Sequence, residues 1–458
     1  MAMMTREAYE ASLDDGRRTF AEGEEIKDLA NHPQFKTSIK LVGDGYEQNY
    51  QPGDDASGPY FGIPSNPAEL KELLRKLATW DMVTVTTSQG LLALLTAAAR
   101  MRADHPDLAE RIENYFEYCK RNDLRCVQAI TDAKGDRRLA PGQQTDPDVY
   151  TRIVERRPDG IVIRGAKLHI SCASVSHELV VMPTKNMKPG DEDYAVACAI
   201  PVNAPGVRIV NTSYAPRERE GDFPVSAGFN MPEGFIILDD VFVPNERVFL
   251  DGQTKYSAGF AHALGLWERL GGTAHMAEYG DQLVGLAQLI AEANGTERIP
   301  HIKEKIAEMV IYATMTRAGL EAAIANADIS PEGWCFPSEL YTNAAKHYAA
   351  ADYSLMVRHV HDIGGGSIVT APSVEDLGNE EIGPFIDKYM ATKEGISGEY
   401  RTRLFHAIRD FTADAFGGWQ LVTMLQSGGG LYAQRLVARK HYDMDHAKKL
   451  ALELAGLA

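Results

Sequence analysis

Residues 126–184 read CVQAITDAKGDRRLAPGQQTDPDVYTRIVERRPDGIVIRGAKLHISCASVSHELVVMPT, and here the pattern of the chain changes from helix to sheet. Two short β-branched runs, 152–156 and 161–165, flank the segment 157–160. The Pro-Asp-Gly sequence in that segment supplies a fixed φ, a side-chain turn and a positive φ in succession. The stretch therefore predicts a β-hairpin that follows a turn-rich polar loop.

The polar loop ahead of the hairpin has features of a ligand site. Residues 131–137 read TDAKGDR. Small residues and Gly135 let the backbone approach a ligand closely, and Arg137 offers a planar fork of donors. The residues alone also allow a structural loop in which Asp136 and Arg137 tie a β domain to the helices before it.

The composition is that of an ordinary globular protein. The chain has 458 residues, of which 44% are hydrophobic and 24% charged, and this is enough for two or three domains with large cores. A net charge of −17 opposes binding to nucleic acid or to an anionic membrane surface. We expect no membrane span of about 18 apolar residues and, because the first residues are charged, no signal peptide. A cytoplasmic protein is therefore predicted.

The cysteines give no sign of a disulfide framework or a structural zinc site. They are widely spaced and form no CxxC pair: Cys119, Cys126, Cys172, Cys198 and Cys335. Reduced thiols that pack in the interior are the expectation for such a pattern. We predict no metal site.

Periodic apolar residues predict helices on both sides of the central region. Residues 27–60 are expected to be mostly loop, and the helices before the centre are 5–13, 65–80, 89–101 and 108–121. Further strands are expected at 178–182, 194–201, 207–210 and 234–243. Long helices are expected at 264–294, 302–327, 338–362, 397–416 and 430–454.

These elements predict an α+β protein with three domains. The long helices pack naturally as a bundle. Short strands separated by proline and glycine suggest an antiparallel barrel or a sandwich. We predict an N-terminal α-helical domain (1–125), a central antiparallel β-barrel domain (126–255) and a C-terminal helical-bundle domain (256–458).

Several motifs carry a family resemblance. They are GDR at 135–137, DPDVYTRIVERRPDGIVIRGAKLH at 146–169, ILDDVFVPNERVF at 237–249, and His275 with Tyr279. With these motifs the chain resembles, over most of its length, the superfamily that joins 4-hydroxyphenylacetate 3-hydroxylase to 4-hydroxybutyryl-CoA dehydratase, and it is nearest the dehydratase branch. The resemblance implies an acyl-CoA-dehydrogenase-like fold, FAD bound between the β domain and the bundle, and a homotetramer.

The resemblance also implies which residues contact FAD. On the β domain and in the bundle loops they are Thr131, Asp136, Arg137, His169, Ser171, Gly364, Gly365 and Gly428. Because a strand alternates its faces, His169 and Ser171 should share one side. The glycines belong to GGGS at 364–367 and SGGG at 427–430, neither of which is a GxGxxG after a strand, so no Rossmann NAD site is implied. On pattern alone each glycine run is a helix stop and start.

Glu233, His275 and Tyr279 are the candidates for catalysis. Glu233 precedes an apolar run, and a carboxylate beside an apolar cleft has a raised pKa and can move protons near neutrality. His275 and Tyr279 are four residues apart and therefore project from one face of a helix. The resemblance implies that Glu233 matches a catalytic-site glutamate, His275 an iron–sulfur ligand and Tyr279 a substrate neighbour of the dehydratases. A solvated turn glutamate and a packing His/Tyr pair are the alternatives.

The chain departs from the dehydratase pattern at the cluster ligands. The positions of the other three ligands, which are cysteines in that branch, hold Thr87, Leu91 and Gln282, and a further glutamate of that branch matches Thr423. Thiolates hold such clusters, and one histidine cannot replace three of them. We therefore expect no iron–sulfur cluster, which argues against radical dehydration of a 4-hydroxyacyl-CoA.

The chain also departs from the monooxygenase pattern. The Arg-x-Pro-Asp-Tyr sequence with which that branch binds phenols is missing around 86–92, and its phenol-contacting histidine matches Gln128. Gln89 and Gln128 are therefore the residues expected to bind substrate. A simple hydroxyphenylacetate substrate is not supported.

These observations predict an FAD-dependent oxidoreductase with a shaped, water-poor cavity. Our first hypothesis is a two-component monooxygenase of a small organic substrate, which uses FADH2 made by a separate flavin reductase. An alternative is a cluster-free acyl-CoA isomerase, dehydratase or desaturase, in which Glu233 or His275 moves a proton. A third is an inactive flavin-binding scaffold.

Overall fold

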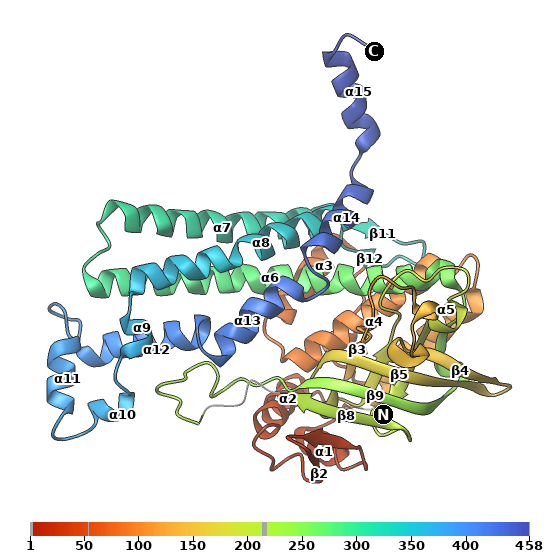
Figure 1. The fold of residues 1–458 in the computed structure, drawn as a ribbon, viewed down its shortest axis with the longest axis horizontal. Coiled ribbons are helices and arrows are strands. Elements are labelled where there is room, and N and C mark those ends of the chain that lie inside the picture. Colours follow the sequence, from red (N-terminus) through yellow and green to blue (C-terminus); the bar gives the residue numbers. More distant parts are fainter. Residues whose placement is uncertain (1–2, 54, 213–217, 458) are drawn as a thin grey trace.

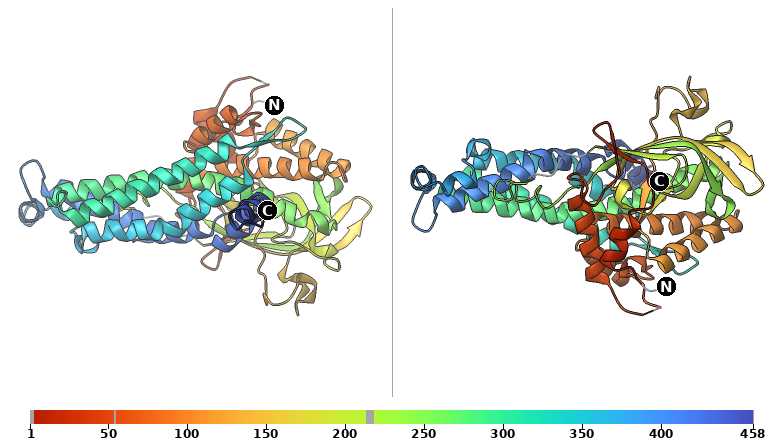
Figure 2. Two further views of the ribbon diagram at one scale, coloured as in Figure 1. Left: turned by 90° about the horizontal axis from the view of Figure 1, so that it is seen from above. Right: turned by 90° about the horizontal axis from the view of Figure 1, so that it is seen from below.

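The computed structural model describes residues 3–53, 55–212 and 218–457. Helices come first, strands follow, and a long helical bundle ends the chain (Figure 1). Figure 2 shows from two further sides that the bundle extends away from the sheets and the N-terminal helices, which gather at one end of it. The N-terminal elements are α1 (Arg6–Ser12), β1 (Thr19–Ala21), β2 (Glu24–Ile26), α2 (Lys36–Asn49), α3 (Pro67–Leu77), α4 (Met82–Met101) and α5 (Pro106–Asn122).

Helix α2 corrects the prediction that residues 27–60 are mostly loop. Ile39, Val42 and Tyr46 recur at helical spacing and are buried. Two glycines within the run masked this pattern, and Gly45 is needed because an added Cβ there would collide with the Asp81 carboxylate. Close packing, rather than a break, therefore accounts for the glycine.

The strands form two main sheets rather than the predicted barrel. In the described residues the larger sheet has the order β2-β1-β8-β9-β5-β4 and the smaller one β10-β7-β6-β3, so each is an open sheet with two edges. The pairs β1–β8 and β3–β6 are parallel, which also corrects the antiparallel prediction. The strands are β3 (Cys126–Ala129), β4 (Arg152–Arg157), β5 (Gly160–Ser171), β6 (Glu178–Val181), β7 (Val196–Pro201), β8 (Val207–Thr212), β9 (Glu233–Pro244) and β10 (Val248–Asp251).

The two sheets share one hydrophobic core. Alternate residues of both contribute to it, among them Val127, Ile163, Leu179, Ile209 and Ile236. The predicted hairpin is confirmed, because β4 and β5 pair antiparallel up to Arg157 and Gly160. Strands β1 and β2 come from the N-terminal segment and extend the larger sheet at β8, so pairing crosses the predicted boundary at residue 125. The domain boundaries stay predictions.

The bundle is built on three long helices, α6 (Thr254–Asn294), α7 (Pro300–Ala325) and α8 (Glu339–Gly364). The predicted helix 397–416 is divided at Asp414, whose side chain caps a new helix by accepting from the Ala415 N–H. The predicted helix 430–454 is likewise two helices. The remaining elements are β11 (Asp328–Ile329), β12 (Cys335–Phe336), α9 (Ser367–Thr370), α10 (Val374–Leu377), α11 (Gly383–Met390), α12 (Gly398–Thr412), α13 (Ala415–Gln426), α14 (Leu431–His441) and α15 (Met444–Leu454).

Helix α4 is long and apolar enough to cross a membrane, which the sequence analysis did not expect. Its residues are mostly buried inside the protein. Core helices of globular proteins have the same composition. The packing of α4 against α5, α6 and β3 accounts for its apolar sequence.

A buried ion pair joins the polar loop to the larger sheet. Lys167 of β5 and Asp132 are almost completely buried, and Lys167 Nζ lies 2.8 Å from Asp132 Oδ1. The same ammonium donates to the carbonyls of Ile130 and Met182, while Asp132 accepts from the Thr151 N–H. Every polar group of the pair thus has a partner, as burial requires.

We predict that Lys167→Met lowers the apparent free energy of unfolding by about 3–5 kcal/mol, because it leaves Asp132 buried without its cation. The measurement is the shift of the denaturant midpoint. The matched control is Arg138→Met, which breaks the exposed pair with Asp136 and should leave the midpoint unchanged. Equal shifts in both variants would contradict the prediction.

Candidate functional site

Glu233 begins β9 opposite Ser171, the last residue of β5. The Ser171 hydroxyl lies 2.9 and 3.1 Å from the two carboxylate oxygens and donates to them, and Trp419 of α13 donates its Nε1–H to Oε1 at 3.1 Å. Burial raises the pKa of Glu233, while the two donors and the charge of His169 act in the opposite direction. A half-buried carboxyl group thus lies where the sheet and the bundle meet.

His169 lies in a bulge of β5. Its φ is +60°, and the register with β9 shifts just before Ile170; such a bulge changes the direction of a side chain. The His169 side chain is exposed, yet near enough for its charge to lower the pKa of Glu233. Because the Leu168 N–H donates to the Thr131 carbonyl at 2.7 Å, the predicted flavin loop begins beside this bulge.

His275 and Tyr279 project from one face of α6, as their spacing predicts. Their rings are nearly parallel, with centroids 6.3 Å apart, and both side chains are half-buried. Burial lowers the pKa of His275. Burial also raises the pKa of Tyr279, and the nearby amide of Gln420 partly offsets this rise. At neutral pH the imidazole is therefore uncharged and can accept a proton, and the phenol keeps its proton and can donate.

A row of aromatic rings connects Tyr279 with Glu233. Tyr279 meets Phe411 edge-on, Phe411 stacks on Phe416, and Phe416 contacts Trp419, with ring centroids 5.7 Å apart at each step. Trp419 then donates to Glu233. The three predicted catalytic residues therefore border one apolar wall that α12 and α13 supply.

Gln420 and Tyr353 are polar residues of this region that the sequence analysis missed. Gln420 of α13 is fully buried and lies beside the phenols of Tyr279 and Tyr353, because its amide acts on the pKa of each. Among the described residues no group forms a hydrogen bond of normal geometry with its Nε2 or Oε1. A single glutamine within the apolar run AFGGWQLVTML was the available signal.

The residues of the predicted flavin loop fit that ligand in part. Gly135 has φ +48°, and a Cβ there would collide with the Gln144 side chain, so the turn needs glycine. Arg137 is exposed and is in no ion pair with the described residues, which suits a pyrophosphate. Asp136, by contrast, pairs with Arg138 inside the loop and does not tie the β domain to the helices.

The three predicted glycines do not lie together in one chain. Gly428 accepts through its carbonyl from Arg269 of α6 at 2.8 Å, and so it lies beside the middle of α6. Gly364 and Gly365 end α8, about 16 Å along that helix from Tyr353 at a rise of about 1.5 Å per residue. The fold does not bring these two glycines to Glu233 or Tyr279.

Gln89 and Gln128, the predicted substrate-binding residues, use their amide groups within the protein. Gln89 is buried and donates to the Trp267 carbonyl at 3.2 Å. Gln128 is half-buried and donates to the Thr86 carbonyl. Gln89 lies on α4 and Gln128 on β3, and their role in substrate binding stays a prediction.

The three positions that match the cysteine ligands of the cluster, Thr87, Leu91 and Gln282, hold no thiolate. Thr87 is buried, and its hydroxyl bonds the backbone of Val83 and Cys126; Leu91 is buried in the core. In the described segments no group of three His, Cys, Asp or Glu side chains could hold a metal ion. These residues do not fit an iron–sulfur cluster, because thiolates are required.

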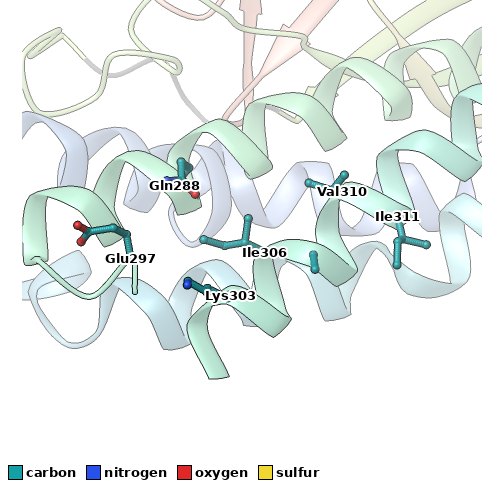
Figure 3. Close-up of a pocket in the computed structure, with 7 residues that line it drawn as sticks. Gln288, Glu297, Lys303, Ile306, Val310 and Ile311 are labelled. Carbon is teal, nitrogen blue, oxygen red and sulfur yellow. The ribbon is translucent and has the colours of Figure 1, made fainter. Parts of the chain in front are cut away.

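A groove of about 430 Å³ lies on the outer side of the bundle, between α6 and α7 (Figure 3). It is mostly apolar and is lined by Gln288, Glu297, Lys303, Ile306, Ala307, Val310 and Ile311. Gln288 is more than two helical turns beyond Tyr279 on α6. The groove is therefore separate from the residues described above.

The sequence matches two family profiles. One, described as 4-hydroxyphenylacetate 3-hydroxylase N terminal, covers residues 5–250, and the other, described as its C terminal, covers residues 257–456. Together they span almost the whole chain.

Similar proteins come from both branches. A 4-hydroxybutyryl-CoA dehydratase/vinylacetyl-CoA-Delta-isomerase of Clostridium aminobutyricum is 29% identical, over 99% of this chain and 100% of its own. A 4-hydroxyphenylacetate 3-monooxygenase oxygenase component of Thermus thermophilus is 26% identical, over 92% and 90%. One solved structure is that of the oxygenase component of 4-hydroxyphenylacetate 3-monooxygenase complexed with FAD. It matches this chain with a TM-score of 0.88 at 24% identity, over 98% of each chain. The two proteins therefore share their fold.

The raised pKa of Glu233 predicts how stability depends on pH. A carboxyl whose folded pKa exceeds its ordinary value of 4.5 contributes stability that is present below pH 4.5 and lost as the pH rises through the folded pKa. Glu233→Gln keeps an acceptor for Trp419 but cannot ionise. The variant should melt at a higher temperature than the parent at neutral pH and at the same temperature below pH 4.5, measured by calorimetry.

The control for this prediction is Glu155→Gln. Glu155 is exposed, and its hydrogen bond with Arg157 lowers its pKa, so the variant should not gain stability at neutral pH. A lower melting temperature of Glu233→Gln at neutral pH would refute the raised pKa.

Proposed function

The chain belongs to the 4-hydroxyphenylacetate 3-hydroxylase family, and from this membership we propose that it is the oxygenase component of a two-component, FAD-dependent monooxygenase. A separate flavin reductase would supply FADH2. The observation that carries the proposal is the donor set between sheet and bundle, where a carboxyl, an imidazole and a phenol border an apolar wall and the cluster positions lack thiolates. Such a site suits flavin chemistry without a metal.

The residues present would hold FAD at the edge of the larger sheet. Arg137 offers its guanidinium to the pyrophosphate, and Thr131 and His169 lie beside each other where the loop meets β5. When bound, reduced FAD would supply the electrons and react with O2. The aromatic wall excludes water from the site.

The protein's own part in the reaction is to orient the substrate and move protons. Neutral His275 can take the proton of a substrate hydroxyl at an imidazole nitrogen, and the Tyr279 O–H can donate to the same oxygen. Glu233, whose pKa is raised by burial and whose carboxyl group is oriented by Ser171 and Trp419, can exchange a proton on the sheet side. The proton transfers at His275 and at Glu233 both depend on burial, because burial shifts the pKa of each group.

A second candidate is a cluster-free acyl-CoA isomerase or desaturase. The full-length similarity to the dehydratase/isomerase of Clostridium aminobutyricum favours it. In this reaction Glu233 or His275 would move a proton of the acyl chain. A CoA thioester, but not a free phenol, would then change the visible spectrum of the flavin-loaded protein.

We also propose a homotetramer that assembles through the outer face of α6 and α7. Val310, Ile311 and Met315 are 45%, 59% and 51% exposed there, beside the apolar groove. Exposed apolar residues that gather on one face are typical of protein contacts. Figure 3 shows Gln288 on α6 and Ile306, Val310 and Ile311 on α7 around this groove.

We predict that the protein with FADH2 and isotopically labelled O2 places one labelled oxygen atom in a phenolic product and the other in water, detected by mass spectrometry. His275→Gln should lower the rate about 100-fold, as loss of a general base does, with unchanged FAD affinity. Tyr432→Phe, on an exposed tyrosine of α14, is the control. Unlabelled products throughout a panel of phenols would exclude monooxygenation.

We predict that Ile311→Glu dissociates the tetramer, because it places a charge in a desolvated contact. The mass in solution, measured by light scattering, should fall to that of dimer or monomer. Val210→Glu, on the exposed face of β8, should leave the mass unchanged. A parent protein that is monomeric at all concentrations would refute the assembly.

A further inference from the structure

Three carbonyls at the end of α13 and in the loop 427–430 are bound by side chains of other helices. Lys346 of α8 donates to the Met424 carbonyl at 2.5 Å, and Arg269 of α6 donates to the Gly428 carbonyl at 2.8 Å. Gln434 of α14 donates to the Gly429 carbonyl at 2.9 Å. Each of these donors is buried. The segment that joins α13 to α14 is thus held from three sides.

Lys346 meets the carbonyl end of α13, and Arg269 meets the loop that follows it. The last carbonyls of a helix have no partner within it and carry partial negative charge. Lys346 has no exposed surface and Arg269 only 5%, so water cannot replace either donor. Arg269 also donates to Asn343 Oδ1 at 2.6 Å, which orients its guanidinium.

The buried ammonium of Lys346 is balanced by a carboxyl group. Burial lowers the pKa of Lys346 to about 8, while Glu268 acts to raise it and Arg269 to lower it. Burial raises the pKa of Glu268 to about 7, which Lys346 opposes. The Met276 thioether lies 3.6 Å from the same nitrogen. Lys346 therefore keeps its proton at neutral pH and can serve as a donor.

Helix α13 carries this constraint to the candidate site. Trp419, which donates to Glu233, precedes Met424 by five residues, about 7.5 Å along the helix axis. Gln420 lies beside the phenols of Tyr279 and Tyr353. Because α13 has only 12 residues, a displacement of its end moves Trp419 and Gln420 with it.

We propose that Lys346 and Arg269 are positioning residues, which fix the end of α13 and the Gly428 loop and thereby hold Trp419 against Glu233. Neither residue bonds Glu233; both act through α13. The inference deepens the proposed function and rests on it for the role of Glu233 in the reaction. The geometry itself requires neither flavin nor substrate.

The experiment compares Lys346→Met and Lys346→Gln in the full chain without flavin or substrate. Methionine keeps the length but removes charge and donor, and glutamine keeps a donor. Removal of one partner of a buried charge pair is destabilising, but Glu268, whose pKa is about 7, can take up a proton, so we expect Lys346→Met to lose stability and still fold. The readouts are hydrogen exchange of the amides of residues 427–430 and titration of the Glu233 carboxyl by infrared spectroscopy, with the band assigned from Glu233→Gln.

In Lys346→Met we expect the 427–430 amides to exchange at least about tenfold faster, as loss of one hydrogen bond to a charged group implies, and the pKa of Glu233 to rise. Lys346→Gln should restore part of the slow amide exchange and bring the pKa of Glu233 part of the way back to its parental value. Ser171→Ala removes a direct hydrogen bond to Glu233 and is the positive control for the change of its pKa. Lys448→Met, on the exposed helix α15, is the negative control.

Two results would overturn the inference. In the first, Lys346→Met exchanges at the parental rate, so that the lysine does not hold the loop. In the second, exchange is faster but Glu233 titrates as in the parent, so that the clamp does not reach the site. Because no flavin is present, neither result depends on the monooxygenase assay, and a failed assay leaves this test intact.

Discussion

The burial of α6 in two hydrophobic cores is the constraint from which the site follows. Its first half packs beside α4 through Phe260, Trp267 and Leu270, and its second half packs in the bundle through Met276 and Leu283. The helix therefore cannot rotate or slide without opening one of the cores, since interiors are densely packed. His275 and Tyr279 lie on the part of α6 where the first core, which Ala274 contacts, gives way to the second, which includes Met276.

The charged groups beside the candidate site keep their places because they are matched to partners. Lys167 and Asp132 hold the predicted flavin loop on β5, and Ser171 and Trp419 hold Glu233. Unmatched charge would be costly in this environment, so Glu233 responds by a raised pKa rather than by exposure. The same physics that stabilises the fold thus raises the pKa of one carboxyl group at the candidate site.

Local signals predicted much of the fold, and long-range contacts account for what they missed. The hairpin and the His275/Tyr279 face depend on neighbouring residues, and both are confirmed. The barrel prediction was wrong because strand order and parallel pairing depend on residues far apart, as in β1 with β8. Trp419 could not be predicted as a partner of Glu233, since 186 residues separate them. The roles of the predicted cofactor and substrate residues stay predictions.

The contact between Gly271 and Gln89 has a consequence for how such a protein can change over generations. An added Cβ at position 271 would collide with the amide of Gln89, which is buried between α4 and α6 and donates to the Trp267 carbonyl. A single codon change at 271 would displace the end of Gln89 from the Trp267 carbonyl, whereas a paired change to a smaller residue at 89 would leave room for the new side chain. Laboratory libraries that diversify the two codons jointly should therefore recover folded variants that one-codon libraries discard.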